Sequence, residues 1–188
     1  KNQVICESQV LGYDYLVVAF GADKMQHKGI SNTLTICGKP EQTLQLRDKL
    51  DALIEKGTGK IAIGFGGNPK DKSAVRGGPA FELIFNIHHY LKKKGLRDKF
   101  ELTMFAPMEQ PGARMGKNAM KAIQTLFGKQ NIQKRFGKKI TEFADDGVIF
   151  EDASKLEADL IMFIAGAKGS AILTDSDLTL SEAGFVKI

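Results

Sequence analysis

The stretch IAIGFGGNPKDKSAVRGGPAFELIF, residues 61–85, reads as a strand, a glycine-rich turn and a helix in direct succession. Its apolar beginning predicts a strand over 60–64, and helical spacing of apolar residues predicts a helix over 79–94. Pro79 suits a first helical position, because its missing N–H would have no partner there. A strand that opens through glycines onto a helix is typical of α/β folds that bind a nucleotide phosphate.

The same alternation continues on both sides of this stretch. The pattern predicts further helices over 40–56 and 117–130, and strands over 100–107, 131–144, 147–152 and 158–166. Strands that alternate with helices form parallel sheets with helices on their faces. We therefore predict an α/β, Rossmann-like domain whose parallel sheet is flanked by helices.

The two ends of the chain resemble one another. VICESQVLGYDYLVVAFGA, residues 4–22, matches VIFEDASKLEADLIMFIAGA, residues 148–167, including an aspartate at Asp14 and Asp159 and a Gly-Ala pair at the end of each. We interpret this as an internal duplication of a strand pair that leads into a buried strand ending near a ligand. The apolar run within 13–21 is accordingly predicted to be a strand buried on both faces.

Composition excludes several classes of protein. The net charge of +5 has no run of aromatic residues or recognition motif beside it, so nucleic-acid binding is not predicted. No apolar run reaches the roughly 18 residues of a membrane span. Two cysteines do not make a disulfide framework, which favours a reducing cytoplasm. His27, His88 and His89 lack metal-ligand spacing, so no metal site is predicted, and no hydrolase or NTPase motif occurs.

The glycine turn departs from the nicotinamide fingerprint. Gly64 and Gly66 give the first two glycines, but the third is absent. The nearest acid after the next strand, Glu109, lies 45 residues after Gly64, whereas the ribose-binding acid usually lies about 20 residues on. NAD binding is therefore only weakly supported by the spacing. Glu82, in the first turn of the helix, fits either a favourable charge at the helix dipole or a proton-transfer group.

Several segments resemble flavoproteins with two dinucleotide-binding domains, and within them the sulfide:quinone oxidoreductases and flavocytochrome c sulfide dehydrogenases. The resemblance rests on YDYLVVAFG at 13–21, SNTLTICGKPEQTLQLRDKL at 31–50, AVRGGPAFELIFNIHHYLKKKGLRDKF at 74–100 and LTMFAPMEQPGARMG at 102–116. It implies FAD as cofactor, a small electron donor, and a quinone or similar acceptor. It also implies an internal piece of a longer enzyme that by itself would not retain FAD or turn over. Any membrane contact would come from segments outside this chain, giving a cytoplasmic or membrane-peripheral protein.

The resemblance also implies domain boundaries and site residues for this chain. Residues 1–39 would be part of an FAD domain with a linker, 40–167 an inserted nucleotide-binding-like domain, and 168–188 the return toward the FAD domain. Cys37 stands where sulfide-oxidising relatives carry a redox cysteine, although an inert loop thiol is the alternative. Arg76 replaces a second cysteine of those relatives, and fits either an anion clamp or a solvated loop charge. The expected cofactor-binding residues are Gly21, Ala22, Gly64, Gly66, Gly78, Pro79 and Gly166.

Three functions stay open on the sequence alone. The first is an FAD-dependent oxidoreductase of the sulfide:quinone type. The second is an NADH:acceptor oxidoreductase like the type II NADH dehydrogenases. The third is a non-catalytic nucleotide-fold module that binds a partner. Because an arginine cannot form a persulfide or a disulfide, Arg76 is the main argument against the first.

Overall fold

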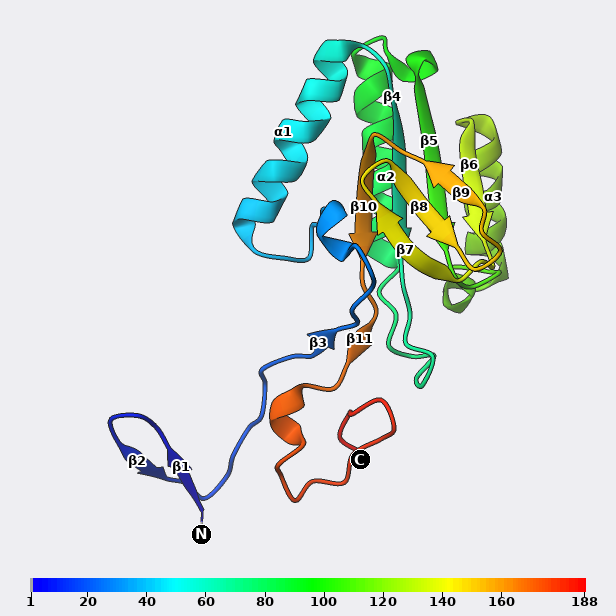
Figure 1. The fold of residues 1–188 in the computed structure, drawn as a ribbon. Coiled ribbons are helices and arrows are strands. Elements are labelled where there is room, and N and C mark those ends of the chain that lie inside the picture. Colours follow the sequence, from blue (N-terminus) through cyan, green and yellow to red (C-terminus); the bar gives the residue numbers. More distant parts are fainter. Residues whose placement is uncertain (1) are drawn as a thin grey trace.

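A computed structural model describes residues 2–188 and contains the predicted parallel sheet (Figure 1). Its four strands lie in the order β10–β4–β5–β6, and every neighbouring pair is parallel. Their bounds are Gly59–Phe65 for β4, Phe100–Ala106 for β5, Ile132–Phe136 for β6 and Leu160–Ile164 for β10. The predicted α/β, Rossmann-like architecture is confirmed.

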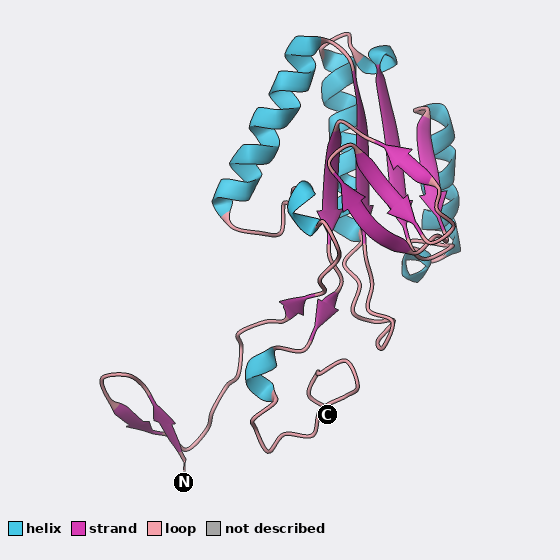
Figure 2. Ribbon diagram, in the orientation of Figure 1, coloured by secondary structure: helices cyan, strands magenta, loops and turns pink. Residues whose placement is uncertain are grey.

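Three helices cover one face of this sheet: α1 (Pro40–Lys56), α2 (Gly78–Lys93) and α3 (Lys117–Lys129). An antiparallel meander of β7 (Ile140–Ala144), β8 (Gly147–Phe150) and β9 (Lys155–Glu157) covers the other face (Figures 1 and 2). Both faces are therefore buried, which is why β4, β5 and β10 are mostly apolar.

Alternation along the strands divides the core into two clusters. On β4, Ile61, Ile63 and Phe65 pack with the helices. Ala62 points the other way and packs with Phe105 of β5 and the meander. A shift of one residue in strand register would exchange these two sets, so the apolar pattern specifies the register.

Local sequence signals account for the bounds of α1. Pro40 occupies its first turn, and the side chain of Gln42 accepts a hydrogen bond of 3.2 Å from the Lys39 N–H. At the other end Gly57 takes a φ of 81°, and its N–H donates to the carbonyls of Leu53 and Ile54. A left-handed residue at this position is the usual glycine stop of a helix.

The two edges of the sheet differ. At the β10 edge, Leu34 continues the pairing: its N–H donates to Ile161 and its carbonyl accepts from Phe163. At the β6 edge, Lys134 and Arg135 stand exposed on a strand that pairs only with β5.

A slender lower section holds both ends of the described chain (Figure 1). It contains the hairpin of β1 (Gln3–Ile5) and β2 (Val10–Gly12), and a ribbon of β3 (Asp23–Lys24) with β11 (Ala167–Lys168). Four short 3-10 turns complete the assigned elements: η1 (Ile30–Asn32), η2 (Arg97–Lys99), η3 (Ala113–Met115) and η4 (Ala171–Leu173).

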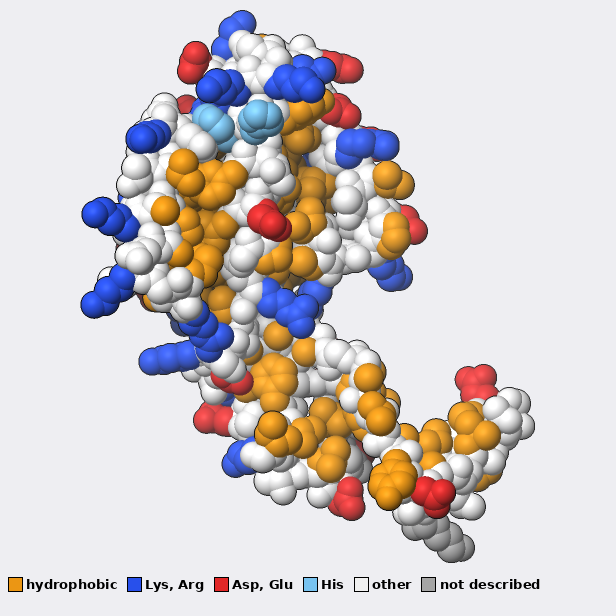
Figure 3. Space-filling view, turned by 180° about the vertical axis from the view of Figure 1, so that it is seen from behind, with side chains coloured by type: hydrophobic (Ala, Val, Ile, Leu, Met, Phe, Trp, Pro, Cys, Tyr) orange, Lys and Arg blue, Asp and Glu red, His pale blue; other side chains and the backbone are white. Residues whose placement is uncertain are grey.

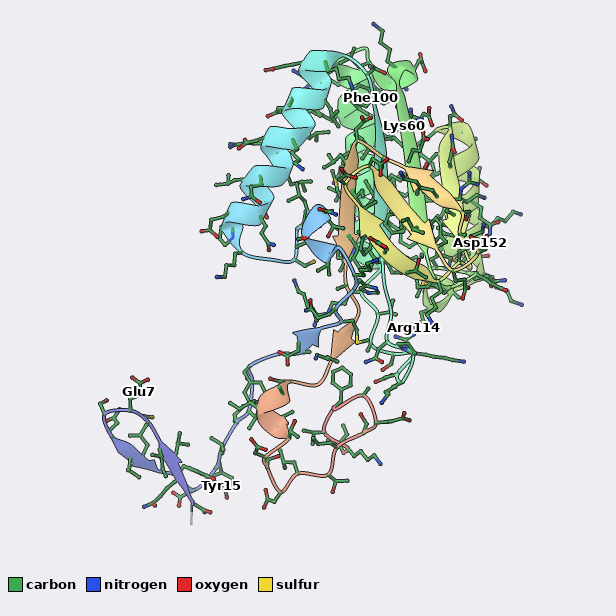
Figure 4. The ribbon with its side chains drawn as sticks, in the orientation of Figure 1. Glu7, Tyr15, Lys60, Phe100, Arg114 and Asp152 are labelled. Atoms are coloured by element: carbon green, nitrogen blue, oxygen red, sulfur yellow. The ribbon has the colours of Figure 1, made fainter. Side chains whose placement is uncertain are left out.

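The predicted buried strand within 13–21 is wrong. These residues have no assigned strand and extend into solvent, with Tyr15 92% and Val17 85% exposed. Figure 3 shows hydrophobic side chains spread over this lower section, and Figure 4 shows Tyr15 far from the sheet. The matching repeat at 148–167 does become a hairpin followed by β10, because β10 has β4 beside it. Residues 15–20 have no such neighbour within 2–188.

Candidate functional site

The loop between β4 and α2, residues 66–77, separates two cavities at the carboxyl end of the sheet. The larger measures about 680 Å³ and lies between this loop and the turn after β5. The smaller measures about 330 Å³ and lies between the same loop, Ala22, Ala167 and Phe185. Val75 lines both cavities and forms the wall between them. Ligands of open α/β sheets bind at this edge, outside the carboxyl ends of the strands.

Hydrogen bonds within the loop fix its path. Asn68 is buried; its side-chain amide donates to the Ala167 carbonyl at 3.0 Å and its oxygen accepts from the Lys70 N–H at 3.0 Å. Asp71 accepts from the Ser73 N–H at 2.7 Å. Hydrogen bonds from Ser73 lower the pKa of Asp71 below its ordinary value, so this carboxylate is ionised at neutral pH.

The smaller cavity combines small side chains with charge. Ala22 and Ala167 form one wall, and the backbone before Ala22 turns through Gly21 with a φ of 80°. Arg76 lines this cavity from the loop side and is exposed. Asp71 contributes a carboxylate to the same lining. The cavity therefore presents a guanidinium and a carboxylate beside small side chains, and the guanidinium can form paired hydrogen bonds with an anion.

Cys37 lies elsewhere, in the turn between η1 and α1. Its thiol is free and exposed, its N–H donates to the Thr35 hydroxyl at 3.2 Å, and its carbonyl accepts from the Lys24 ammonium. Cys37 lines neither of the two cavities. Arg76 and Cys37 thus do not line a common cavity.

Three of the expected cofactor-binding glycines are closely packed against protein atoms. A Cβ on Gly64 would lie 2.4 Å from the Phe105 ring, and one on Gly66 would lie 3.0 Å from the Phe163 ring. A Cβ on Gly166 would lie 2.5 Å from the backbone of Gly67. Glycine is required at these positions for the close approach of chain segments.

The remaining expected residues face open space or the start of a helix. A Cβ on Gly21 or on Gly78 would meet no atom within 4 Å. Gly78 begins α2 and lines the larger cavity, and Pro79 follows it in the first turn. Glu109, the nearest acid after β5, is exposed, and its Cγ would lie 3.1 Å from a Cβ on Gly137. It does not line either cavity.

His27 is a feature that the sequence interpretation missed. Its Nε2 is buried without a hydrogen-bond partner, beside Gly66 at the end of β4. The ring packs edge-on against Phe143 and Phe163, with centroid distances of 5.8 and 5.2 Å. Burial lowers the pKa of His27. Residue spacing in the sequence could not predict this burial of His27, because the contacts come from strands more than a hundred residues away in the chain.

The described residues 2–188 contain neither a metal-binding cluster nor a membrane-spanning helix. No group of three or more His, Cys, Asp or Glu side chains lies close enough to bind a metal ion. No helix in this part of the chain has the length and apolar character to cross a membrane.

A family model for pyridine nucleotide-disulphide oxidoreductases matches residues 1–188. The chain belongs to this family. Among its relatives, a sulfide-quinone reductase of Aquifex aeolicus is 28% identical over 194 residues, covering 93% of this chain and 41% of the relative. The chain thus spans less than half the length of that relative.

Solved structures of the same fold give a consistent result. The sulfide:quinone oxidoreductase from Aquifex aeolicus matches with a TM-score of 0.81 and 25% identity, over 98% of this chain and 44% of that chain. A ferredoxin reductase from Rhodopseudomonas palustris matches with a TM-score of 0.67 and 17% identity, over 96% and 42%. A water-forming NADH oxidase from Lactobacillus brevis, bound to NADH, matches with a TM-score of 0.60 and 17% identity, over 94% and 36%. The last two likenesses show the pyridine nucleotide-disulphide oxidoreductase fold alone.

Proposed function

We propose that this chain is part of an FAD-dependent oxidoreductase of the sulfide:quinone type, which passes electrons from a small reductant through flavin to a quinone. The observation that carries the proposal is the match of 98% of the chain to the Aquifex sulfide:quinone oxidoreductase at a TM-score of 0.81. The independent sequence match to a sulfide-quinone reductase supports it.

The smaller cavity fits the flavin side of such an enzyme. Ala22 and Ala167 leave room for a flat ring to approach, and Gly21 adds no side chain. A bound FAD would supply the two-electron redox chemistry between donor and acceptor. Arg76 lines the same cavity and would hold an anionic donor such as hydrosulfide beside the ring. In this arrangement residues 1–39 and 168–188 accompany the FAD-binding part, and 40–167 form the inserted domain.

An NADH-dependent enzyme is less well supported by the site. A bound NAD needs an acid at the end of the second strand to accept hydrogen bonds from its ribose. Glu109 is the nearest acid there, and it lies against Gly137 rather than in the lining of either cavity. The donor is therefore proposed to be a small anion rather than a dinucleotide.

The test uses the full-length protein loaded with FAD under exclusion of oxygen. Sulfide should bleach the flavin absorption band, and a short-chain quinone should restore it in a second step. NADH at the same concentration should leave the band unchanged. Bleaching by NADH alone would replace the proposal with an NADH:acceptor oxidoreductase, and a protein that cannot be loaded with flavin would support a non-catalytic binding module.

A further inference from the structure

We propose that the larger cavity is a second ligand site, specific for an amphipathic organic anion with an apolar body and a carboxylate or phosphate head. It lies on the other side of the 66–77 loop from the cavity assigned to the flavin side, and Val75 separates the two. The proposal rests on the lining of the larger cavity and does not depend on the redox activity proposed above.

The size and position suit an organic ligand. At about 680 Å³ the cavity falls within the roughly 300–1,000 Å³ typical of sites for small organic molecules. One side is formed by the loop after β4 and the start of α2, and the other by the turn after β5 that contains η3. Two loops from neighbouring parallel strands thus enclose it.

The inner lining is apolar and adaptable. Phe65 from β4 and Phe81 from α2 supply aromatic surface, and Val75 supplies the dividing wall. Met108 and Met115 line it from the turn after β5. Methionine side chains are unbranched and polarisable, and they adapt to apolar ligands of different shape. Such a lining fits an aliphatic or aromatic body rather than a sugar.

Charge at the cavity has one sign. Among the described residues that line it, the charged side chains are Lys72, from the loop after β4, and Arg114, from the turn after β5. Both are exposed, and Arg114 also donates a long hydrogen bond of 3.4 Å to the Ser73 carbonyl (Figure 4 labels Arg114 beside the 66–77 loop). Asp71 lies near enough to Arg114 for attraction, but its carboxylate accepts from the Ser73 N–H and does not line this cavity. Two cations from opposite sides favour an anionic head.

The same lining argues against a dinucleotide. No carboxylate lines the cavity to accept hydrogen bonds from a ribose. The Phe65 ring lies so close to Gly77 that a Cβ there would be 2.5 Å from it. This places an apolar ring beside the start of α2, where a pyrophosphate would need exposed amides. The ligand that remains is a smaller amphiphile with a single charged head.

The experiment titrates the full-length protein with decanoate, below its micelle concentration, by isothermal titration calorimetry. Decanoate or decyl phosphate should bind with one-to-one stoichiometry, and the stronger of the two identifies the head. Decanol should bind at least about tenfold more weakly, because it lacks the charge. In a protein labelled at its methionine methyl groups, the NMR signals of Met108 and Met115 should shift on binding, whereas that of Met104, buried in the core, should not.

Variants at exposed positions distinguish this site from general surface binding. The double change Lys72→Gln and Arg114→Gln, and separately Met115→Glu, should each weaken decanoate at least about tenfold with the melting temperature unchanged. Lys134→Gln, on the exposed β6 edge, is the matched control and should have no effect. Decanoate affinity that is the same in all variants would overturn the proposal. So would tight binding of NADH or of inorganic phosphate in competition with decanoate.

Discussion

The Nε–H of Arg97 donates a hydrogen bond of 2.8 Å to Nδ1 of His88, so a buried guanidinium is paired with a neutral imidazole. The other nitrogens of Arg97 donate to the carbonyls of Phe100, Gln130 and Asn131 at 2.7–2.8 Å. One side chain thereby joins the end of α2, the start of β5 and the end of α3.

This contact predicts a loss of stability in acid. Burial lowers the pKa of His88 below its ordinary 6.5, and the charge of Arg97 lowers it further. Below about pH 6.5 the unfolded chain therefore binds a proton that the folded protein resists, and the free energy of unfolding falls until the pH reaches the folded-state pKa. Urea denaturation between pH 5 and 8 measures this slope.

The control for this prediction places at position 88 a side chain that can accept the hydrogen bond from Arg97 but does not titrate. His88→Asn should flatten the pH dependence, with a remainder from His27, whose pKa burial also lowers. Asn86→Gln, at an exposed position of the same helix that carries no titrating group, should leave the slope unchanged. A slope that His88→Asn does not alter would contradict the prediction.

Gly29 should tolerate no side chain. It has a φ of 70°, and a Cβ there would lie 1.9 Å from the carbonyl oxygen of Phe143 in β7. Gly29→Ala should therefore reduce the free energy of unfolding by more than about 3 kcal/mol, measured by chemical denaturation. Gly57→Ala is the matched control, since Gly57 is also left-handed but has open space around it. It should cost only about 1–2 kcal/mol. Equal losses in both variants would show that the contact with Phe143 is not decisive.

Asn68 should anchor the loop between the two cavities. Asn68→Ala removes its bonds to Ala167 and Lys70 and should cost about 1–3 kcal/mol, with faster proteolysis of the 66–77 loop. Asn68→Asp keeps the acceptor for the Lys70 N–H and loses only the donor to Ala167, so its effect should be intermediate. If the 66–77 loop of the Asn68→Ala variant is cleaved no faster than that of the unchanged protein, Asn68 does not anchor the loop.

Arg76 is predicted to bind the anionic donor. In the full-length enzyme Arg76→Ala should raise the KM for sulfide about tenfold or more, the factor that corresponds to about 1.4 kcal/mol. Arg76→Lys keeps the charge without the planar fork and should recover part of the affinity. Steady-state kinetics at several ionic strengths provide the measurement. A KM for sulfide that is identical in all three proteins would make Arg76 a solvated loop charge.

Cys37 is predicted to act as the redox thiol of the proposed enzyme. Cys37→Ser should slow flavin reduction by sulfide at least about tenfold, because a hydroxyl does not attack sulfur species as a thiolate does. Cys6→Ser is the control, since Cys6 is also a free, exposed cysteine. Stopped-flow absorbance of the flavin band measures both. Equal rates of flavin reduction in the two variants would show that Cys37 is an inert loop thiol.

The repeated segments show what local sequence can and cannot predict. Residues 4–22 and 148–167 both contain the predicted strand pair, which folds into the hairpins β1–β2 and β8–β9, because hairpin formation depends on neighbouring residues. After the second hairpin, Asp159 accepts from the Lys60 N–H at 2.7 Å, and β10 pairs with β4. After the first, residues 15–20 meet no adjacent strand within 2–188. Apolar sequence signals a strand, but pairing needs a partner that the local pattern does not specify.

The glycines of the opening loop illustrate the same limit for the site. Their presence predicted a close backbone approach, and for Gly64 and Gly66 the approaching groups are the rings of Phe105 and Phe163. Phe163 lies nearly a hundred residues further along the chain, so spacing alone could not distinguish a packed side chain from a ligand. The position of Val75 between two cavities could not be predicted from the sequence either. It depends on where Ala22 and Phe185 lie in the fold.

The charged β6 edge has a consequence for behaviour at high concentration. A sheet edge presents unpaired backbone groups that can template a strand from another molecule. Lys134 and Arg135 put two like charges on that edge, so the edges of two copies repel each other before their backbones can pair. The two charges at this edge therefore disfavour aggregation through strand pairing between molecules.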